Sequence, residues 1–262
     1  MMNRDDFVGY AVPALMMGLG LAVWEGVVRY FAIPPYLLPA PSLIIITLFT
    51  DWQTLSASLW VTLSITLKAL AVAVVGSVTL AIVFAQSRML ERAFYPFAVA
   101  MQVTPIVAIA PLLLIYLTPG VAVLVCAFLV AFFPLLANTT LGLSSADHNL
   151  VDLFQMYRAS RMQEFTLLRL PSALPYFLAG LRISGGLALI GAIVAEIAAG
   201  SAGQGSGLAY RIVESGFRLN IPRMFAALLL ISVAGITIHV LLTALSHWLL
   251  RDWHDSERVS EA

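Results

Sequence analysis

Residues 146–175 read ADHNLVDLFQMYRASRMQEFTLLRLPSALP, and this polar stretch separates two long runs of apolar sequence. It begins with a segment rich in large apolar side chains, residues 150–157. Ser160 is followed three residues later by Gln163, a spacing typical of a capping box at the start of a second helix. We expect Pro171 to end that helix, because proline lacks an amide hydrogen and clashes with the preceding turn. The stretch therefore predicts two short helices joined by a tight turn.

This two-helix insert fits two roles. Two short helices with an apolar face form a knob that a groove in a partner protein can hold. The other interpretation is an ordinary surface loop that rests on the bilayer. In both cases the insert is the first candidate for a functional surface.

The sequence on either side of the insert predicts an all-α membrane protein. Of the 262 residues, 61% are hydrophobic and 11% are charged, whereas soluble domains carry about 25% charged residues. The apolar runs are too long for strands and do not alternate strictly, so they are expected to be helices. The net charge is zero, which gives no indication of a nucleic-acid partner.

Six apolar runs reach the length of about 20 residues that a helix needs to cross a bilayer. Two of them share the uncharged stretch 93–146, in which Thr118-Pro119-Gly120 supplies the turn. We expect residues 1–262 to form a single transmembrane domain that carries the insert 146–175. The expected spans are residues 7–33, 57–87, two within 93–146, 176–200 and 222–250.

The arginines indicate how the chain is oriented. Six spans place both termini on one side of the membrane, and most arginines fall in the segments on that side, including 88–92 and 158–169. Residues 30–67 contain no lysine or arginine. By the positive-inside rule, the insert and both termini of this multi-pass protein are expected to be cytoplasmic.

Two features are expected near the opposite side of the membrane. Glu25 and Arg29 lie four residues apart on the first span, so their side chains can pair. A proline-rich connector follows, and residues 42–50 then predict a short interfacial helix.

The insert resembles the cytoplasmic signature of ABC importer permeases, which reads Glu-Ala-Ala, three residues, Gly, nine residues and then Ile-x-Leu-Pro. At the same spacing, Asp152-Leu153-Phe154 stands at Glu-Ala-Ala, Arg158 at the glycine and Leu168-Arg169-Leu170-Pro171 at Ile-x-Leu-Pro. Other segments resemble the branch that imports nitrate, taurine, aliphatic sulfonates and thiamine-pyrimidine precursors. These are residues 170–182, Ala195-Glu196, 38–42 and Trp24-Glu25.

The insert departs from that signature at the glycine and at both alanines. Arg158 must either adopt a left-handed backbone, at a cost of about 1 kcal/mol or more, or keep the turn right-handed. Both alanines are replaced by larger residues, so the insert is expected to have a shape matched to its own partner.

The resemblance implies a type I ABC importer permease with six transmembrane helices and a coupling insert. Such a chain pairs with a second copy, two cytoplasmic ATPase subunits hold the insert, and a periplasmic binding protein delivers the solute. ATP and Mg are implied on the ATPase, and no catalytic residue, cofactor or metal is assigned to this chain. The residues expected to contact the ATPase are Asp152, Leu153, Phe154, Tyr157, Arg158, Leu168, Leu170 and Pro171.

The lysine content agrees with this division of labour. A P-loop needs Gly-Lys-Ser/Thr, whereas Lys68, the only lysine in the sequence, follows a leucine inside a span. The chain therefore lacks that route to ATP hydrolysis.

Ionisable and polar residues inside the spans are candidates for the solute path, because they are costly in lipid. Lys68 can pair with an acid, snorkel to an interface or face the path. Glu196 can act in a gate between two permease copies or be hydrated at the membrane edge. Gln102, Thr104 and Pro105 give the third span polarity and a kink, which suits either a solute path or interhelical hydrogen bonds.

The expected function is thus solute permeation by alternating access, for a small polar organic molecule or an oxyanion. One alternative is a self-sufficient secondary transporter that uses Glu196 and Lys68 for ion coupling, although paired interrupted helices in two inverted halves are missing. Another is an intramembrane protease built on Ser184 and His239, for which the sequence has no supporting pattern.

Overall fold

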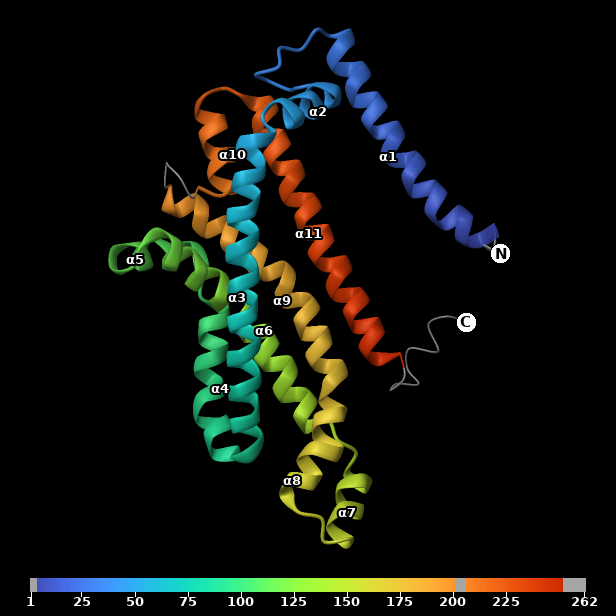
Figure 1. The fold of residues 1–262 in the computed structure, drawn as a ribbon, viewed down its shortest axis with the longest axis vertical. Coiled ribbons are helices and arrows are strands. Elements are labelled where there is room, and N and C mark those ends of the chain that lie inside the picture. The colour runs from blue at the N-terminus through green and yellow to red at the C-terminus, as the bar shows by residue number, and fades with distance from the viewer. Residues whose placement is uncertain (1–3, 201–205, 252–262) are drawn as a thin grey trace.

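The computed structural model describes residues 4–200 and 206–251, and the regular structure in these ranges is helical (Figure 1). Five helices are long and apolar enough to cross a membrane, and the bent pair α4 and α5 makes a sixth if it counts as one span. This agrees with the expected all-α fold. The elements are α1 (Arg4–Tyr30), α2 (Pro41–Thr50), α3 (Trp52–Gln86), α4 (Arg88–Val103), α5 (Ile106–Tyr116), α6 (Pro119–Ser144), α7 (His148–Met156), α8 (Arg161–Glu164), the π-helical turn η1 (Phe165–Arg169), α9 (Leu170–Ala199), α10 (Leu208–Phe217) and α11 (Ile221–Leu250).

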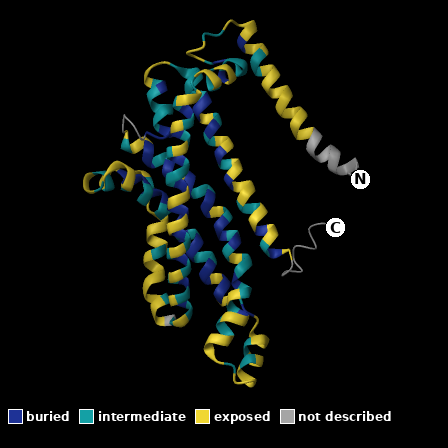
Figure 2. Cartoon of the chain, in the orientation of Figure 1, coloured by how far each residue is buried: buried dark blue, intermediate teal, exposed yellow. Residues whose placement is uncertain are grey.

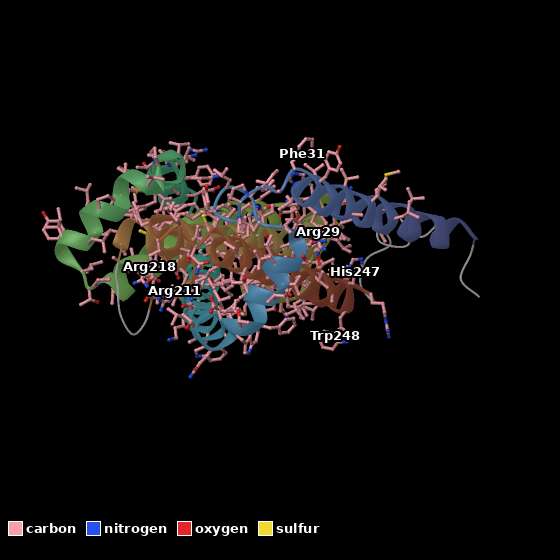
Figure 3. The ribbon with its side chains drawn as sticks, turned by 90° about the horizontal axis from the view of Figure 1, so that it is seen from above. Arg29, Phe31, Arg211, Arg218, His247 and Trp248 are labelled. Atoms are coloured by element: carbon pink, nitrogen blue, oxygen red, sulfur yellow. The ribbon has the colours of Figure 1, made fainter. Side chains whose placement is uncertain are left out.

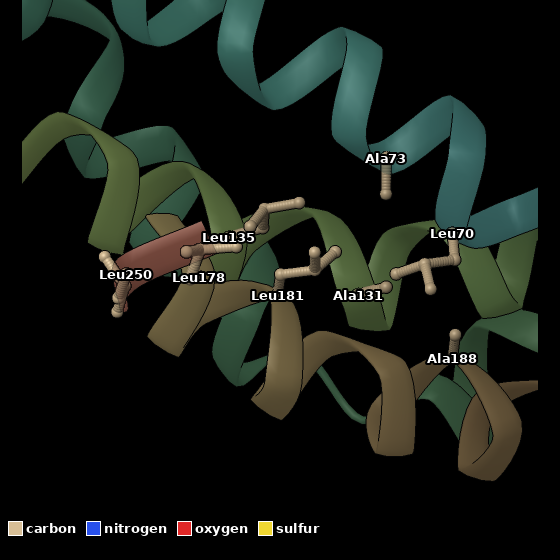
Figure 4. Packing of buried hydrophobic residues seen from close by; sticks show 8 residues of the cluster. All are labelled: Leu70, Ala73, Ala131, Leu135, Leu178, Leu181, Ala188 and Leu250. Carbon is tan, nitrogen blue, oxygen red and sulfur yellow. The ribbon is translucent and has the colours of Figure 1, made fainter. Parts of the chain in front are cut away.

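The centre of the bundle consists of α3, α6 and α9, which hold most of the buried side chains (Figures 1 and 2). Helices α6 and α9 approach closely because small residues face each other. A Cβ added to Gly191 would lie 2.9 Å from the Cα of Ala127. Lipid tails are as apolar as leucine, so helices in a membrane associate through such close packing rather than through hydrophobic burial. Figure 4 shows one core cluster, in which Ala131 and Ala188 leave room for larger leucines such as Leu135.

Helix α1 stands beside the bundle, and most of its described side chains are exposed (Figure 2). Its C-terminal half is tied to α2 by Glu25, whose carboxylate accepts hydrogen bonds from the Ser42 amide at 3.0 Å and from its hydroxyl at 2.7 Å. The expected ion pair is confirmed, with 2.6 Å between Arg29 Nε and Glu25 Oε1. Glu25 therefore caps α2, whose own N-cap residue, Ala40, has no side chain that can do so. The short helix expected over residues 42–50 is also present as α2, and its place at the membrane interface stays a prediction.

The third expected span is broken rather than kinked. Helices α4 and α5 meet at an angle of 98°. Between them Thr104 and Pro105 have extended backbones, and a residue that precedes proline is restricted in this way. Helix α5 consequently projects sideways from the bundle (Figure 1).

The prediction that Pro171 ends a helix is wrong. The Leu170 amide donates to the Phe165 carbonyl, a π-type bond five residues back. Pro171 then falls in the first turn of α9, where its missing amide hydrogen costs little. Arg161–Ala199 is therefore one continuous helical segment of 39 residues, roughly 58 Å long at 1.5 Å per residue. The second helix of the insert and the fifth span form one rod.

Candidate functional site

The insert lies at one end of the bundle, where α7 and α8 form a hairpin (Figure 1). The predicted capping box is confirmed. The Gln163 amide donates to Ser160 Oγ at 3.2 Å, and the Ser160 amide donates to Gln163 Oε1 at 2.8 Å. These reciprocal bonds satisfy two donors that a helix start leaves free, so the turn into α8 is locally encoded.

Arg158 adopts the left-handed alternative, with φ at +53°. The Arg158 amide donates to the Gln155 carbonyl, and the Ala159 amide donates to the Phe154 carbonyl, each at 2.9 Å. This pair of bonds is the Schellman motif that ends many helices, usually with glycine in the left-handed position. The insert thus keeps the turn of the family signature with an arginine, at a cost of about 1 kcal/mol or more.

The residues predicted to contact an ATPase divide into two groups. Asp152, Leu153, Tyr157 and Arg158 are exposed, with Leu153 at 43% and Tyr157 at 81%, and Phe154 beside them is half-buried. We call these five residues the insert face. The second group is Leu168, Leu170 and Pro171. Leu168 is only 6% exposed and packs inside the chain, whereas Leu170 and Pro171 line a cavity beside the hairpin.

Glu196 lies at the other end of the continuous segment and is buried, with 5% exposure. Its carboxylate accepts hydrogen bonds from Thr62 Oγ1 at 2.8 Å and from the Ala209 amide at 3.1 Å. Thr62 Oγ1 in turn accepts from the Leu208 amide at 2.9 Å. The two side chains cap the first turn of α10, and a Cβ at Gly207 would overlap the carboxylate. The alternative of a side chain hydrated at the membrane edge is therefore wrong.

The role of Thr62 was not predicted from the sequence. A signal was present, because Ser58, Thr62 and Thr66 recur every four residues and therefore share one face of α3, where all three are buried. A buried polar stripe of this kind requires partners. Ser58 accepts a hydrogen bond from Arg211 at 3.0 Å, and Thr62 accepts one from the Leu208 amide in the first turn of α10.

Two ion pairs within α10 and its C-cap, and one that joins α11 to the start of α3, lie at the same end. Arg211 and Arg218, neighbours in Figure 3, both bind Glu214, at 2.8 and 3.0 Å. The hydrogen bond from Arg211 is the main reason that the pKa of Glu214 lies below its usual range, and it outweighs the opposing effect of burial. Arg223, in the first turn of α11, binds Asp51 at 2.6 Å. The end opposite the insert is thus held together by charge.

Lys68 is exposed near the middle of α3. Within the described ranges its ammonium group has no ion-pair partner, so the pairing alternative is wrong. Snorkelling and a place in the solute path both stay predictions.

Gln102 and Thr104 line a cavity of about 320 Å³ where α4 breaks, against α6 and α9. The Thr104 hydroxyl donates to the Ala100 carbonyl of its own helix at 2.8 Å. Among the described residues Gln102 has no side-chain hydrogen bond, so neither side chain makes the interhelical bond considered above. Their place in a solute path stays a prediction.

The protease arrangement is contradicted. Ser184 is buried and donates its hydroxyl hydrogen to the Ala131 carbonyl at 2.7 Å, whereas His239 is exposed on α11. In the part of the chain that the structure describes, no group of three histidine, cysteine or carboxylate side chains is placed to hold a metal ion.

Comparison with known proteins agrees with this architecture. Residues 73–252 match the family described as the binding-protein-dependent transport system inner membrane component. The chain is 32% identical to a probable ABC transporter permease protein of Haemophilus influenzae, over 90% of this chain and 95% of that protein.

Two further relatives have names that specify a solute. The chain is 33% identical to the formylaminopyrimidine transport permease protein ThiX of Halalkalibacterium halodurans, over 86% of this chain and 88% of the relative. It is 32% identical to the riboflavin transport system permease protein RibX of Chloroflexus aurantiacus, over 97% and 94%. With its apolar spans, the chain is a multi-pass inner-membrane protein, and it belongs to the binding-protein-dependent transport system inner membrane components, the permeases of ABC importers.

Proposed function

We propose that this chain forms the membrane path of an ATP-driven importer and that its insert face binds a cytoplasmic ATPase subunit. The observation that carries the proposal is the continuity of Arg161–Ala199. A movement imposed on the insert reaches the far end of the bundle along one uninterrupted helical segment. Such a rod suits alternating access, in which the two ends of the path open in turn.

The contact at Glu196 extends this mechanical link. Because Glu196 holds the start of α10, α10 follows the far end of the rod. Close packing of α9 on α6 carries the same movement into the centre of the bundle. The predicted path at Gln102 and Thr104 borders both helices, so it would change shape with them.

The proposal includes the orientation and the partners. The insert and both termini face the cytoplasm, a second copy of the chain completes the path, and ATP and Mg bind to the ATPase. A periplasmic solute-binding protein docks at the end that carries α2 and α10, where Phe217 is 86% exposed.

The solute class follows from the relatives and from the cavity. Two relatives are named for a formylaminopyrimidine and for riboflavin, which are organic solutes. The cavity at the α4 break offers one amide and one hydroxyl in an otherwise apolar wall, and no charged residue lines it. We therefore propose a small polar organic solute rather than an oxyanion, to be identified by assaying the binding protein with candidate ligands.

The test is co-purification of the chain with its ATPase after Tyr157→Asp, with Phe154→Asp as a second variant. Removing one well-packed aromatic contact costs more than about 1 kcal/mol, and a buried charge adds to this, so we expect at least about a tenfold loss of complex. The control is Phe217→Asp, an equally exposed aromatic residue at the opposite end, which should leave ATPase binding unchanged.

Retention of the full complex and of transport-coupled ATP hydrolysis in Tyr157→Asp would contradict the docking assignment. Uptake by the chain alone in proteoliposomes, driven by a proton or sodium gradient, would instead support the secondary-transporter alternative.

A further inference from the structure

Two cavities lie side by side where the insert joins the bundle. The first has a volume of about 440 Å³ and lies between α3, α6 and α9, with Val78, Leu174 and Phe177 among its lining residues. Its two hydroxyl groups, on Thr139 and Thr166, donate to backbone carbonyls of their own helices at 2.7 and 2.8 Å. The wall of this cavity is therefore effectively apolar.

The second cavity, of about 610 Å³, has more polar lining residues than the first and shares Ile82 with it. It is lined by Arg161, Arg169 and Glu164. Arg169 is neutralised by Glu164, to which it binds through both Nε and Nη2 at 2.8 and 2.7 Å. Arg161 is exposed and has no ion-pair partner in the described ranges, so the cavity carries one uncompensated positive charge.

The two cavities follow one another along α3 and along the segment Arg161–Ala199. Gln86, the last residue of α3, lines the polar cavity, whereas Ile82 and Val78 lie about 6 and 12 Å deeper along the helix. On the other wall, Phe177 lies eight residues beyond Arg169, again about 12 Å deeper. In the proposed orientation, this order places the charge at the membrane edge and the apolar cavity at the depth of the lipid chains.

We propose that these two cavities together bind one anionic phospholipid. An acyl chain lies in the apolar cavity, and the phosphate of the headgroup binds Arg161. Basic pockets between membrane helices are known to hold anionic headgroups. The π-helical turn η1 lines both cavities, through Thr166 and Arg169, so a bound lipid would contact the joint between the insert and α9.

The experiment measures lipid binding to the purified full chain by native mass spectrometry, without the ATPase. The probes are phosphatidylglycerol and phosphatidylcholine with identical acyl chains. We expect tighter binding of phosphatidylglycerol. Arg161→Gln should reduce that preference roughly fivefold, the contribution of one arginine near an anionic surface. Arg92→Gln is the control, because Arg92 is an exposed arginine near the same edge that lines neither cavity.

A second pair of variants tests the apolar part. Ile82→Trp fills the junction of the two cavities and should lower the binding of both lipids, whereas Val83→Trp, on the neighbouring exposed position, should not. Inorganic phosphate at millimolar concentration should not displace phosphatidylglycerol, because phosphate lacks the acyl chain.

Three results would overturn the proposal. One is equal binding of the two lipids by the unmodified chain, and another is the same loss in Arg161→Gln and Arg92→Gln. The third is an Ile82→Trp variant that keeps its lipid but no longer co-purifies with the ATPase. The apolar cavity would then be occupied by a protein partner. Since Arg161 is exposed, Arg161→Gln is expected to fold. This variant therefore still tests the proposal if Ile82→Trp does not fold.

Discussion

Thr62→Val is the most informative single change at the end opposite the insert. Valine keeps the shape of threonine but can neither donate to Glu196 nor accept from the Leu208 amide. Thr66→Val, one turn along the same buried face, is a matched control, because the Thr66 hydroxyl bonds only to the Thr62 carbonyl of its own helix, at 2.8 Å.

The magnitude follows from the groups left without partners. A buried amide that loses its acceptor costs about 1–3 kcal/mol, and the lost hydrogen bond to a carboxylate contributes about 1.5–3 kcal/mol. The two do not add fully, because a cavity of about 30 Å³ beside Glu196 has room for one water molecule. We therefore expect the free energy needed to detach α10 from α9 and α3 to fall by about 2–4 kcal/mol.

Hydrogen exchange of the backbone amides measures this directly. A change of 2–4 kcal/mol corresponds to roughly 30- to 700-fold faster exchange of Leu208 and Ala209. Thr66→Val should leave these two amides unchanged. Exchange that is equally slow in Thr62→Val would refute the reasoning, since α10 would then be held by other contacts, such as the hydrogen bond from Arg211 to Ser58 and the apolar packing of Leu208.

Three further predictions concern pH, backbone strain and helix packing. The pKa of the Glu214 carboxyl group is lowered in the folded chain. Its contribution to stability is therefore complete above the carboxyl pKa of the unfolded chain and is lost as the pH falls through the pKa of the folded chain. In thermal unfolding, the stability difference between the unmodified chain and Glu214→Gln should shrink on acidification. Arg158→Gly should stabilise the insert by about 1 kcal/mol, because glycine adopts the left-handed backbone without strain; slower proteolysis of the insert would confirm it, and faster proteolysis would count against it. Gly191→Ala should destabilise the chain by about 1–3 kcal/mol in a denaturant titration, because the added methyl group meets the α6 backbone, whereas Gly186→Ala, with open space at its Cβ, should be neutral; equal effects would disprove the packing argument.

The features that the sequence predicted correctly depend on neighbours within about one helical turn. Long apolar runs identify spans wherever they occur, and the capping box at Ser160 works through residues three apart. The Glu25–Arg29 pair follows from the same helical periodicity. The sequence also identified Arg158 as the residue whose backbone is either left-handed or right-handed. Only the structure shows that it is left-handed.

The errors arose where a local rule met a longer-range contact. Pro171 would end an isolated helix, but the π-helical turn before it places the proline in a first turn and lets α9 continue. A kink was predicted from Thr104 and Pro105. Only the packed structure shows that the bend is 98° and that a cavity lies beside it.

Composition and long apolar runs were thus enough to identify a helical membrane protein, because crossing lipid imposes length and hydrophobicity on each span separately. The permease family came from the resemblance of the insert and its neighbouring segments to a known signature. The partners of the polar residues required the tertiary structure. Glu196 meets Thr62 across 134 positions of chain, and Leu208 meets Thr62 across 146. No local pattern specifies such pairs, since they exist only once helices distant in sequence have packed and excluded water from the groups between them.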